Sequence, residues 1–181
     1  MDFKKCIVES GKKLENSGLT VETWGNISIR DPETGLVYLT PSAMKYSTIV
    51  EDDVVVCRLD GTIVEGHRKP TIETGLHLAV YRNREEVNAV IHTHPMYSMV
   101  YATQGKDIPL IIDEAAQAMG DTCKCTQYAL PGSEKLSVKR HWERKQIPVF
   151  CIPMELSAWA RVWTQRLKWQ PSWRQQPEFF T

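Results

Sequence analysis

The stretch VNAVIHTH, residues 87–94, joins an apolar run to two histidines and organises the rest of the chain. Its apolar part is typical of a buried strand, and its polar end predicts where that strand leaves the core. Side chains of a strand alternate between faces, so His92 and His94 are expected to point the same way. Two imidazoles on one face can bind one cation such as zinc. The alternative is a pair of surface or hydrogen-bonded histidines.

The segments around this strand alternate between helical and extended patterns. Residues 2–17 predict an amphipathic helix that ends at Gly18. A second helix is predicted at 72–82, with Thr71 as its N-cap and Glu73 in its first turn, where the helix dipole favours an acid. Further strands are predicted at 23–30, 37–40 and 53–59, a helix after Pro95, and a strand followed by a helix at 109–120. This order predicts an α/β fold with a central, mainly antiparallel sheet covered by helices.

Composition excludes several classes of protein. The 181 residues are 42% apolar, and 22 Lys and Arg balance 22 Asp and Glu, which argues against a nucleic-acid binder. No run has membrane-spanning length and the N-terminus is unlike a signal peptide, so a cytoplasmic protein without membrane contact is expected. The five cysteines are expected to be reduced. Cys123 and Cys125 could hold a soft metal, although ordinary buried cysteines explain them as well.

Five motifs occur together in the first three quarters of the chain: TWGNIS (23–28), VYLTPSAMKY (37–46), EGHRKPTIET (65–74), NAVIHTHPMYS (88–98) and LPGSEKL (130–136). In this order and spacing they resemble the class II aldolase/adducin head-domain family, in the branch of the L-fuculose-phosphate aldolases. The resemblance implies a single-domain, three-layer α/β/α sandwich over residues 1–138. It also implies a Zn²⁺ or other divalent metal, a phosphosugar substrate and a cytoplasmic homotetramer.

The same resemblance assigns roles to individual residues. His92 and His94 would bind the metal, and Glu73 would be the acid/base, able to approach the metal when no substrate is bound. The substrate phosphate would be bound by Gly25, Asn26, Ser42 and Thr71. Turn amides and hydroxyls can hold a phosphate without a lysine, although turn and cap chemistry explains these residues too. The expected reaction cleaves a ketose 1-phosphate, such as L-fuculose 1-phosphate, to dihydroxyacetone phosphate and an aldehyde.

Three positions depart from the family pattern. Asp113 stands where fuculose-phosphate aldolases have a catalytic tyrosine, Ala43 replaces a glycine, and Ile72 replaces a phosphate-binding serine. These changes argue against fuculose phosphate as the substrate and leave the metal residues in place. The alternatives on the same fold are a pentulose-phosphate 4-epimerase, a methylthioribulose-phosphate dehydratase, or a non-catalytic scaffold like the adducin head.

The character of the chain changes at residues 139–181. Five of the six tryptophans lie in 142–173, and the third metal histidine of the family, expected near residue 153, is missing. A shifted reading frame forms each new codon from the last base of one codon and the first two bases of the next. In that frame, the junctions Met154–Glu155 and Trp159–Ala160 can encode only glycine. With permitted bases elsewhere, residues 153–180 become HGAVCVGPGMDSAFEVATVLEATARIF, which restores the histidine.

We therefore interpret residues 139–181 as an out-of-frame tail that replaces the final strand and helices and leaves sheet edges exposed. The chain as printed is expected to be unstable or inactive, whereas its in-frame form is expected to be the aldolase. The alternative is a divergent, tryptophan-rich tail.

Overall fold

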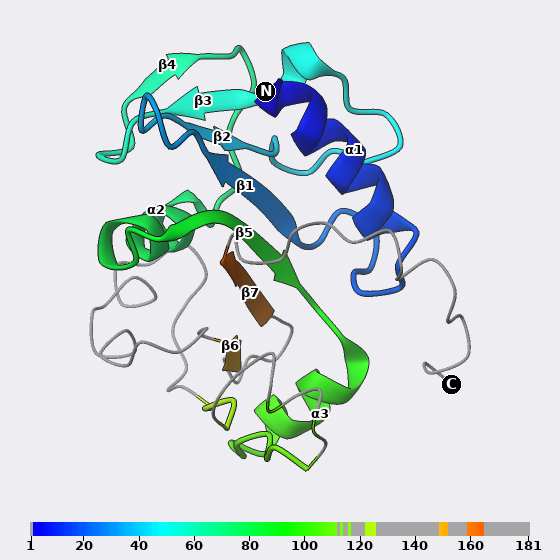
Figure 1. The fold of residues 1–181 in the computed structure, drawn as a ribbon. Coiled ribbons are helices and arrows are strands. Elements are labelled where there is room, and N and C mark those ends of the chain that lie inside the picture. The colour runs from blue at the N-terminus through cyan, green and yellow to red at the C-terminus, as the bar shows by residue number, and fades with distance from the viewer. Residues whose placement is uncertain are drawn as a thin grey trace.

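A computed structural model describes residues 2–111, 113, 116, 122–125, 149–151 and 159–164. Within these ranges, one seven-stranded sheet has the order β4-β3-β2-β1-β5-β7-β6 (Figure 1), and every neighbouring pair is antiparallel. The strands are β1 (Asn26–Arg30), β2 (Val37–Leu39), β3 (Val55–Cys57), β4 (Ile63–Glu65), β5 (Val87–Thr93), β6 (Val149–Cys151) and β7 (Trp159–Thr164). The helices are α1 (Phe3–Glu15), α2 (Thr74–Asn83), α3 (Met96–Thr103) and the short 3₁₀ helix η1 (Glu51–Asp53). The predicted α/β class and mainly antiparallel sheet are confirmed.

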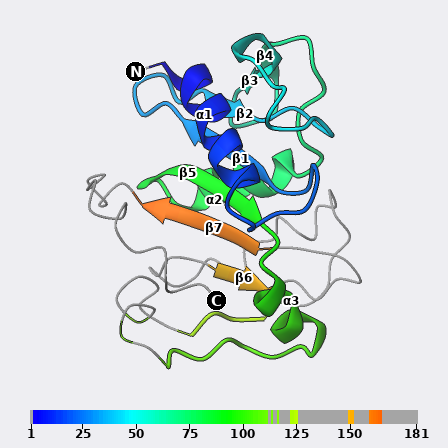
Figure 2. The same cartoon turned by 90° about the vertical axis from the view of Figure 1, so that its right-hand side faces the viewer.

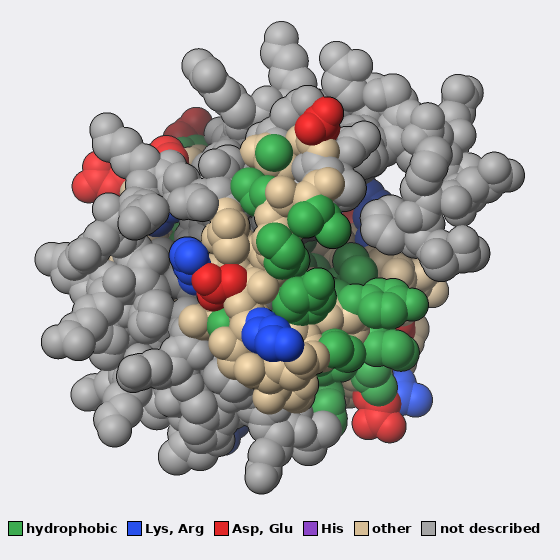
Figure 3. Space-filling view, turned by 90° about the horizontal axis from the view of Figure 1, so that it is seen from below, with side chains coloured by type: hydrophobic (Ala, Val, Ile, Leu, Met, Phe, Trp, Pro, Cys, Tyr) green, Lys and Arg blue, Asp and Glu red, His purple; other side chains and the backbone are tan. Residues whose placement is uncertain are grey.

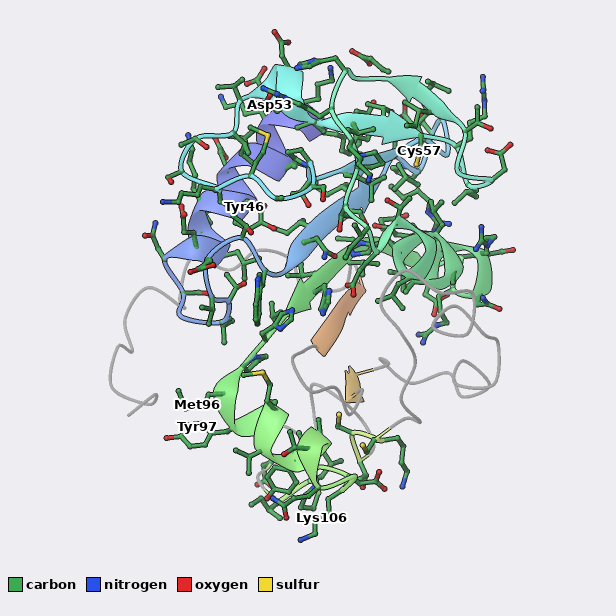
Figure 4. The ribbon with its side chains drawn as sticks, turned by 180° about the vertical axis from the view of Figure 1, so that it is seen from behind. Tyr46, Asp53, Cys57, Met96, Tyr97 and Lys106 are labelled. Atoms are coloured by element: carbon green, nitrogen blue, oxygen red, sulfur yellow. The ribbon has the colours of Figure 1, made fainter. Side chains whose placement is uncertain are left out.

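Helices α1 and α2 cover opposite faces of this sheet (Figures 1 and 2). On α1, Ile7 and Leu14 share one face and pack with Ile27 of β1 and with Tyr46, which lies beside α1 in Figure 4. Because side chains alternate along a strand, the next residue, Ser28, faces α2 instead. The two faces of β1 therefore belong to different layers, as a three-layer sandwich requires.

The α2 face of the sheet combines an apolar core with the polar residues of the site. Leu76 and Val80 of α2 pack with Val37 and Leu39 of β2 and with Val90 of β5. Strand β5 is an interior strand between β1 and β7, and it carries the chain out to α3 (Figure 1). The apolar packing near the middle of β5 thereby fixes the position of the histidines at its end.

Helix α3 exposes an apolar surface. Met96 and Tyr97 are 70% and 79% exposed and project outward (Figure 4), and apolar side chains gather on the face seen in Figure 3. Such patches are common at protein interfaces, but the homotetramer stays a prediction. No helix in the described ranges has the length and apolar character needed to cross a bilayer.

One local prediction is wrong, and one strand was missed. Helix α2 begins at Thr74, because the Thr74 amide bonds the Thr71 carbonyl at 3.1 Å in a turn that precedes the helix. Glu73, and not Thr71, therefore occupies the N-cap position. Strand β4 was not predicted, because its residues are all exposed and lack alternation. The strand and helix expected at 109–120 lie largely outside the described residues.

The segment 139–181 contributes β6 and β7 to the sheet. Strand β7 pairs with β5, with Ala160 opposite His92 and Trp159 opposite Thr93. The expectation that this edge of β5 would be left exposed is therefore wrong, because the segment supplies a paired strand. The out-of-frame origin of these residues stays a prediction.

Candidate metal and acid–base site

The structure brings Glu73, His92 and His94 together at the end of β5. The N-terminus of α2 carries Glu73 to the strand, and its Oε2 lies against Nδ1 of His92. The rings of His92 and His94 are stacked, with their centroids 4.8 Å apart. All three side chains are buried, at 3–6% exposure. The expected pairing of two imidazoles with one carboxylate is therefore present in the fold.

Two nitrogens in this group lack hydrogen-bond partners. Nε2 of His92 and Nδ1 of His94 are buried, and neither has a partner among the described residues. An orphaned buried nitrogen costs free energy unless something binds it, so this donor set fits a divalent cation. The described part of the chain contains no group of three or more His, Cys, Asp and Glu side chains arranged as a metal site. The pair is thus short of ligands, since catalytic zinc sites use three protein ligands.

The protonation state of His94 suits a metal ligand, and that of Glu73 suits a general base. Burial, reinforced by the neighbouring His92, lowers the pKa of His94 to about 4, so its ring is neutral near pH 7. Burial alone would raise the pKa of Glu73, but the electrostatic interaction with His92 and the hydrogen bond from it outweigh burial and lower that pKa. Glu73 is therefore a carboxylate, and a carboxylate can accept a proton from a substrate.

A buried chain of polar side chains lies behind the site, and the sequence did not predict it. Ser28 Oγ lies 2.7 Å from Tyr81 Oη and 2.6 Å from Nδ1 of His77, whose Nε2 contacts Oδ1 of Asn26. Asn26 Nδ2 in turn lies 3.5 Å from Glu73 Oε2. The signal was available, because Glu73, His77 and Tyr81 follow each other at spacings of four on one helix face.

The expected phosphate residues occupy adjacent segments. A bridge between Pro41 and Pro70 joins the two loops, and the Ser42 amide bonds the Lys69 carbonyl at 2.9 Å. Thr71 Oγ1 accepts from the Glu73 amide at 3.3 Å. The Asn26 side chain points toward Glu73 and His77, so its amide group is already engaged in the site. Ala43 has φ +57°, a conformation that favours the glycine of the family pattern.

Gly25 allows close packing of its loop on β5. It has φ +91°, and a Cβ there would come within 2.8 Å of the His92 carbonyl oxygen. Gly25→Ala should therefore shift the backbone of His92 and destabilise the fold by about 2–4 kcal/mol, from left-handed strain plus overpacking. Gly35→Ala is the matched control, because Gly35 has φ +71° with no neighbour within 4 Å of an added Cβ. Urea unfolding of both variants checks this, and equal losses of stability would contradict it.

The buried imidazole of His77 predicts acid lability. Burial lowers the pKa of His77 from 6.5 to about 3, so the unfolded chain binds a proton between these values that the folded chain does not. Stability is therefore full above 6.5 and falls with pH below it, by up to about 1.4 kcal/mol per unit. His94 adds a similar share. Urea unfolding across this range measures the slope. His77→Gln should reduce it by about half and leave the share of His94, and an unchanged slope in that variant would contradict the assignment.

Comparison with known proteins gives the family. The model of the Class II Aldolase and Adducin N-terminal domain family matches residues 5–152, and this chain belongs to that family. A 5-deoxy-D-ribulose 1-phosphate aldolase of Bacillus thuringiensis serovar kurstaki is 43% identical over 131 residues, 72% of this chain and 61% of the relative. An L-ribulose-5-phosphate 4-epimerase of Salmonella paratyphi B is 36% identical over 125 residues, 69% of this chain and 55% of the relative.

A solved structure confirms the fold. An L-fuculose 1-phosphate aldolase superposes with a TM-score of 0.82 at 29% identity, over 90% of this chain and 76% of that one. The chain thus spans about three fifths of the length of the two curated relatives. The family match runs to residue 152, so it includes the first part of the segment 139–181.

Proposed function

We propose that this chain carries the acid–base and metal-binding residues of a class II lyase that cleaves a ketose 1-phosphate to dihydroxyacetone phosphate and an aldehyde. The observation that supports this most strongly is the contact of the Glu73 carboxylate with a histidine whose other nitrogen is buried and unpartnered. A scaffold would have no need for an orphaned imidazole nitrogen beside a buried carboxylate.

In this proposal Glu73 moves the proton. Cleavage removes a proton from the hydroxyl whose carbon becomes the aldehyde, and it returns a proton to the carbon that loses its bond. Glu73 is buried and ionised, and it is held at the N-terminus of α2. A positioned carboxylate of this kind contributes about 10²–10⁴ in rate. The loops around Ser42 and Thr71 would hold the phosphate through amides and hydroxyls.

His92 and His94 would hold a divalent cation such as Zn²⁺, with Glu73 beside it. When bound, such a cation supplies Lewis-acid stabilisation for the negative charge that cleavage places on the substrate. The third protein ligand would come from the in-frame form of residues 139–181. In the present 181-residue chain, β7 has the sequence WARVWT, which contains no His, Cys, Asp or Glu.

The substrate we favour is a 5-deoxypentulose 1-phosphate. The 43% identical relative is named for 5-deoxy-D-ribulose 1-phosphate, and the departures at Ala43, Ile72 and Asp113 argue against fuculose phosphate. A pentulose-phosphate 4-epimerase is the second candidate, since the 36% identical relative carries that name. The cytoplasmic location and the tetramer stay predictions.

The test is a substrate panel on two proteins, the printed chain and a chain with residues 139–181 replaced by the in-frame reading. Dihydroxyacetone phosphate is measured with a coupled dehydrogenase, and epimerisation is measured by chromatography. We expect the in-frame chain to release dihydroxyacetone phosphate from 5-deoxy-D-ribulose 1-phosphate fastest. Epimerisation without cleavage would favour the second candidate. An in-frame chain that binds zinc but acts on no phosphosugar would refute the proposal.

A further inference from the structure

The buried chain behind the site contains a histidine that no part of the proposed reaction uses. His77 and Ser28 are 0% exposed and Tyr81 is 1% exposed. Burying three polar side chains is unfavourable unless each is fully hydrogen-bonded. Here the bonds form one connected path that ends at Glu73, the acid–base residue. Because the path ends on the reacting carboxylate, the side chains along it can fix the orientation of that carboxylate.

The Glu73 carboxylate sets the direction of every donor along this path. A carboxylate only accepts, so the group of Asn26 that faces it is the Nδ2 amide, 3.5 Å from Oε2. Oδ1 of Asn26 is then the acceptor for Nε2–H of His77. A neutral imidazole has one donor and one acceptor, so Nδ1 of His77 accepts from the Ser28 hydroxyl. The reverse arrangement would place the Asn26 oxygen against a buried carboxylate.

The same logic determines which nitrogen of His92 carries its proton. Nδ1 of His92 lies against Oε2 of Glu73 and 3.2 Å from Nδ2 of Asn26. A lone pair on Nδ1 would face the carboxylate oxygen, so Nδ1 carries the proton and donates to Glu73. The lone pair of His92 is then on Nε2, which is the buried nitrogen without a partner.

We propose that His77 is a positioning residue that holds the Asn26 amide in one orientation, and through it aims Glu73 and keeps the lone pair of His92 on Nε2. Burial keeps His77 neutral, with its pKa lowered to about 3, so a single donor and a single acceptor persist across the working range of pH. The assignment depends on the proposed function only in naming a cation as the species that His92 Nε2 binds.

The test compares two substitutions in the full 181-residue chain. His77→Leu removes both nitrogens at similar size, whereas His77→Gln keeps an N–H that can face Asn26. Long-range ¹H–¹⁵N correlation spectra of metal-free, ¹⁵N-labelled protein report the tautomer of each histidine. We expect Nε2–H at His77 and Nδ1–H at His92 in the parent. His92 should stay Nδ1–H in His77→Gln and become a mixture of tautomers in His77→Leu.

Zinc affinity is the second measurement, made by competition with a chromophoric chelator. His77→Leu should bind Zn²⁺ about 10–100-fold more weakly, as expected for loss of a residue that orients a ligand, and His77→Gln within a few-fold of the parent. A folded leucine variant with parental His92 tautomer and zinc affinity would overturn the assignment. If leucine prevents folding, the parent spectrum decides, because an Nδ1–H tautomer at His77 contradicts it. Absence of zinc binding in these proteins and also in the chain with the in-frame tail would count against the proposed function, while the tautomers still test His77.

Discussion

Glu73→Gln should lower the rate of ketose 1-phosphate cleavage by about 10²–10⁴ in the chain with the in-frame tail, the loss expected when a positioned general acid/base is removed. Glutamine has the shape of glutamate but does not take up a proton near pH 7. The amide can still face Asn26, which lies 3.5 Å from the Glu73 oxygen. Zinc binding should therefore survive, because His92 and His94 are untouched. Initial rates and a chelator competition on the same preparation measure the two effects.

A matched control separates chemistry from general damage. Glu9 lies on the exposed face of α1, and Glu9→Gln makes the same chemical change far from the site. It should leave rate and zinc affinity unchanged. A Glu73→Gln variant that keeps most of the rate would show that another group moves the proton. A fold-loss of zinc affinity equal to the fold-loss of cleavage rate would mean that Glu73 serves mainly as a metal ligand.

The parts of the fold that follow from local periodicity were predictable. The apolar run of β5 and the amphipathic face of α1 gave the right element types, because burial imposes those periods directly. Helix α2 started later than expected, because the Thr74 amide bonds the Thr71 carbonyl in a turn that precedes the helix. Strand β4 escaped prediction because it is exposed and therefore carries no burial pattern. Prediction failed where hydrogen bonds, and not burial, decide the conformation.

The residues of the candidate site also divide into those that the sequence predicted and those that it did not. The pairing of His92 with His94 follows from strand geometry, and Glu73 was identified by resemblance. His77 was overlooked because it stands among apolar residues of α2 and looks like a core position. Its role depends on a contact with Asn26, 51 positions earlier in the chain, and no local pattern shows such a contact. Long-range polar contacts of this kind become visible only when β1, β5 and α2 are placed together.

Replacing residues 139–181 with the in-frame reading should strengthen zinc binding by more than about 100-fold, because even residues that only orient a ligand contribute 10–100-fold. The structure shows why the printed chain is poor in ligands. Ala160 is opposite His92 in β7, and the described residues offer only two unpartnered imidazole nitrogens. The restored histidine would fall at the junction of Pro153 and Met154, between β6 and β7. Zinc titration of both chains measures the difference.

The decisive control is the in-frame chain with its restored histidine changed to alanine. This protein keeps the new strand and helices and lacks only the ligand, so its zinc affinity should return to that of the printed chain while its stability stays higher. If the printed chain instead binds zinc as tightly as the in-frame chain and cleaves the same phosphosugar, then residues 139–181 are a genuine, divergent tail. The metal would then be held without a ligand from β7, which contains no His, Cys, Asp or Glu.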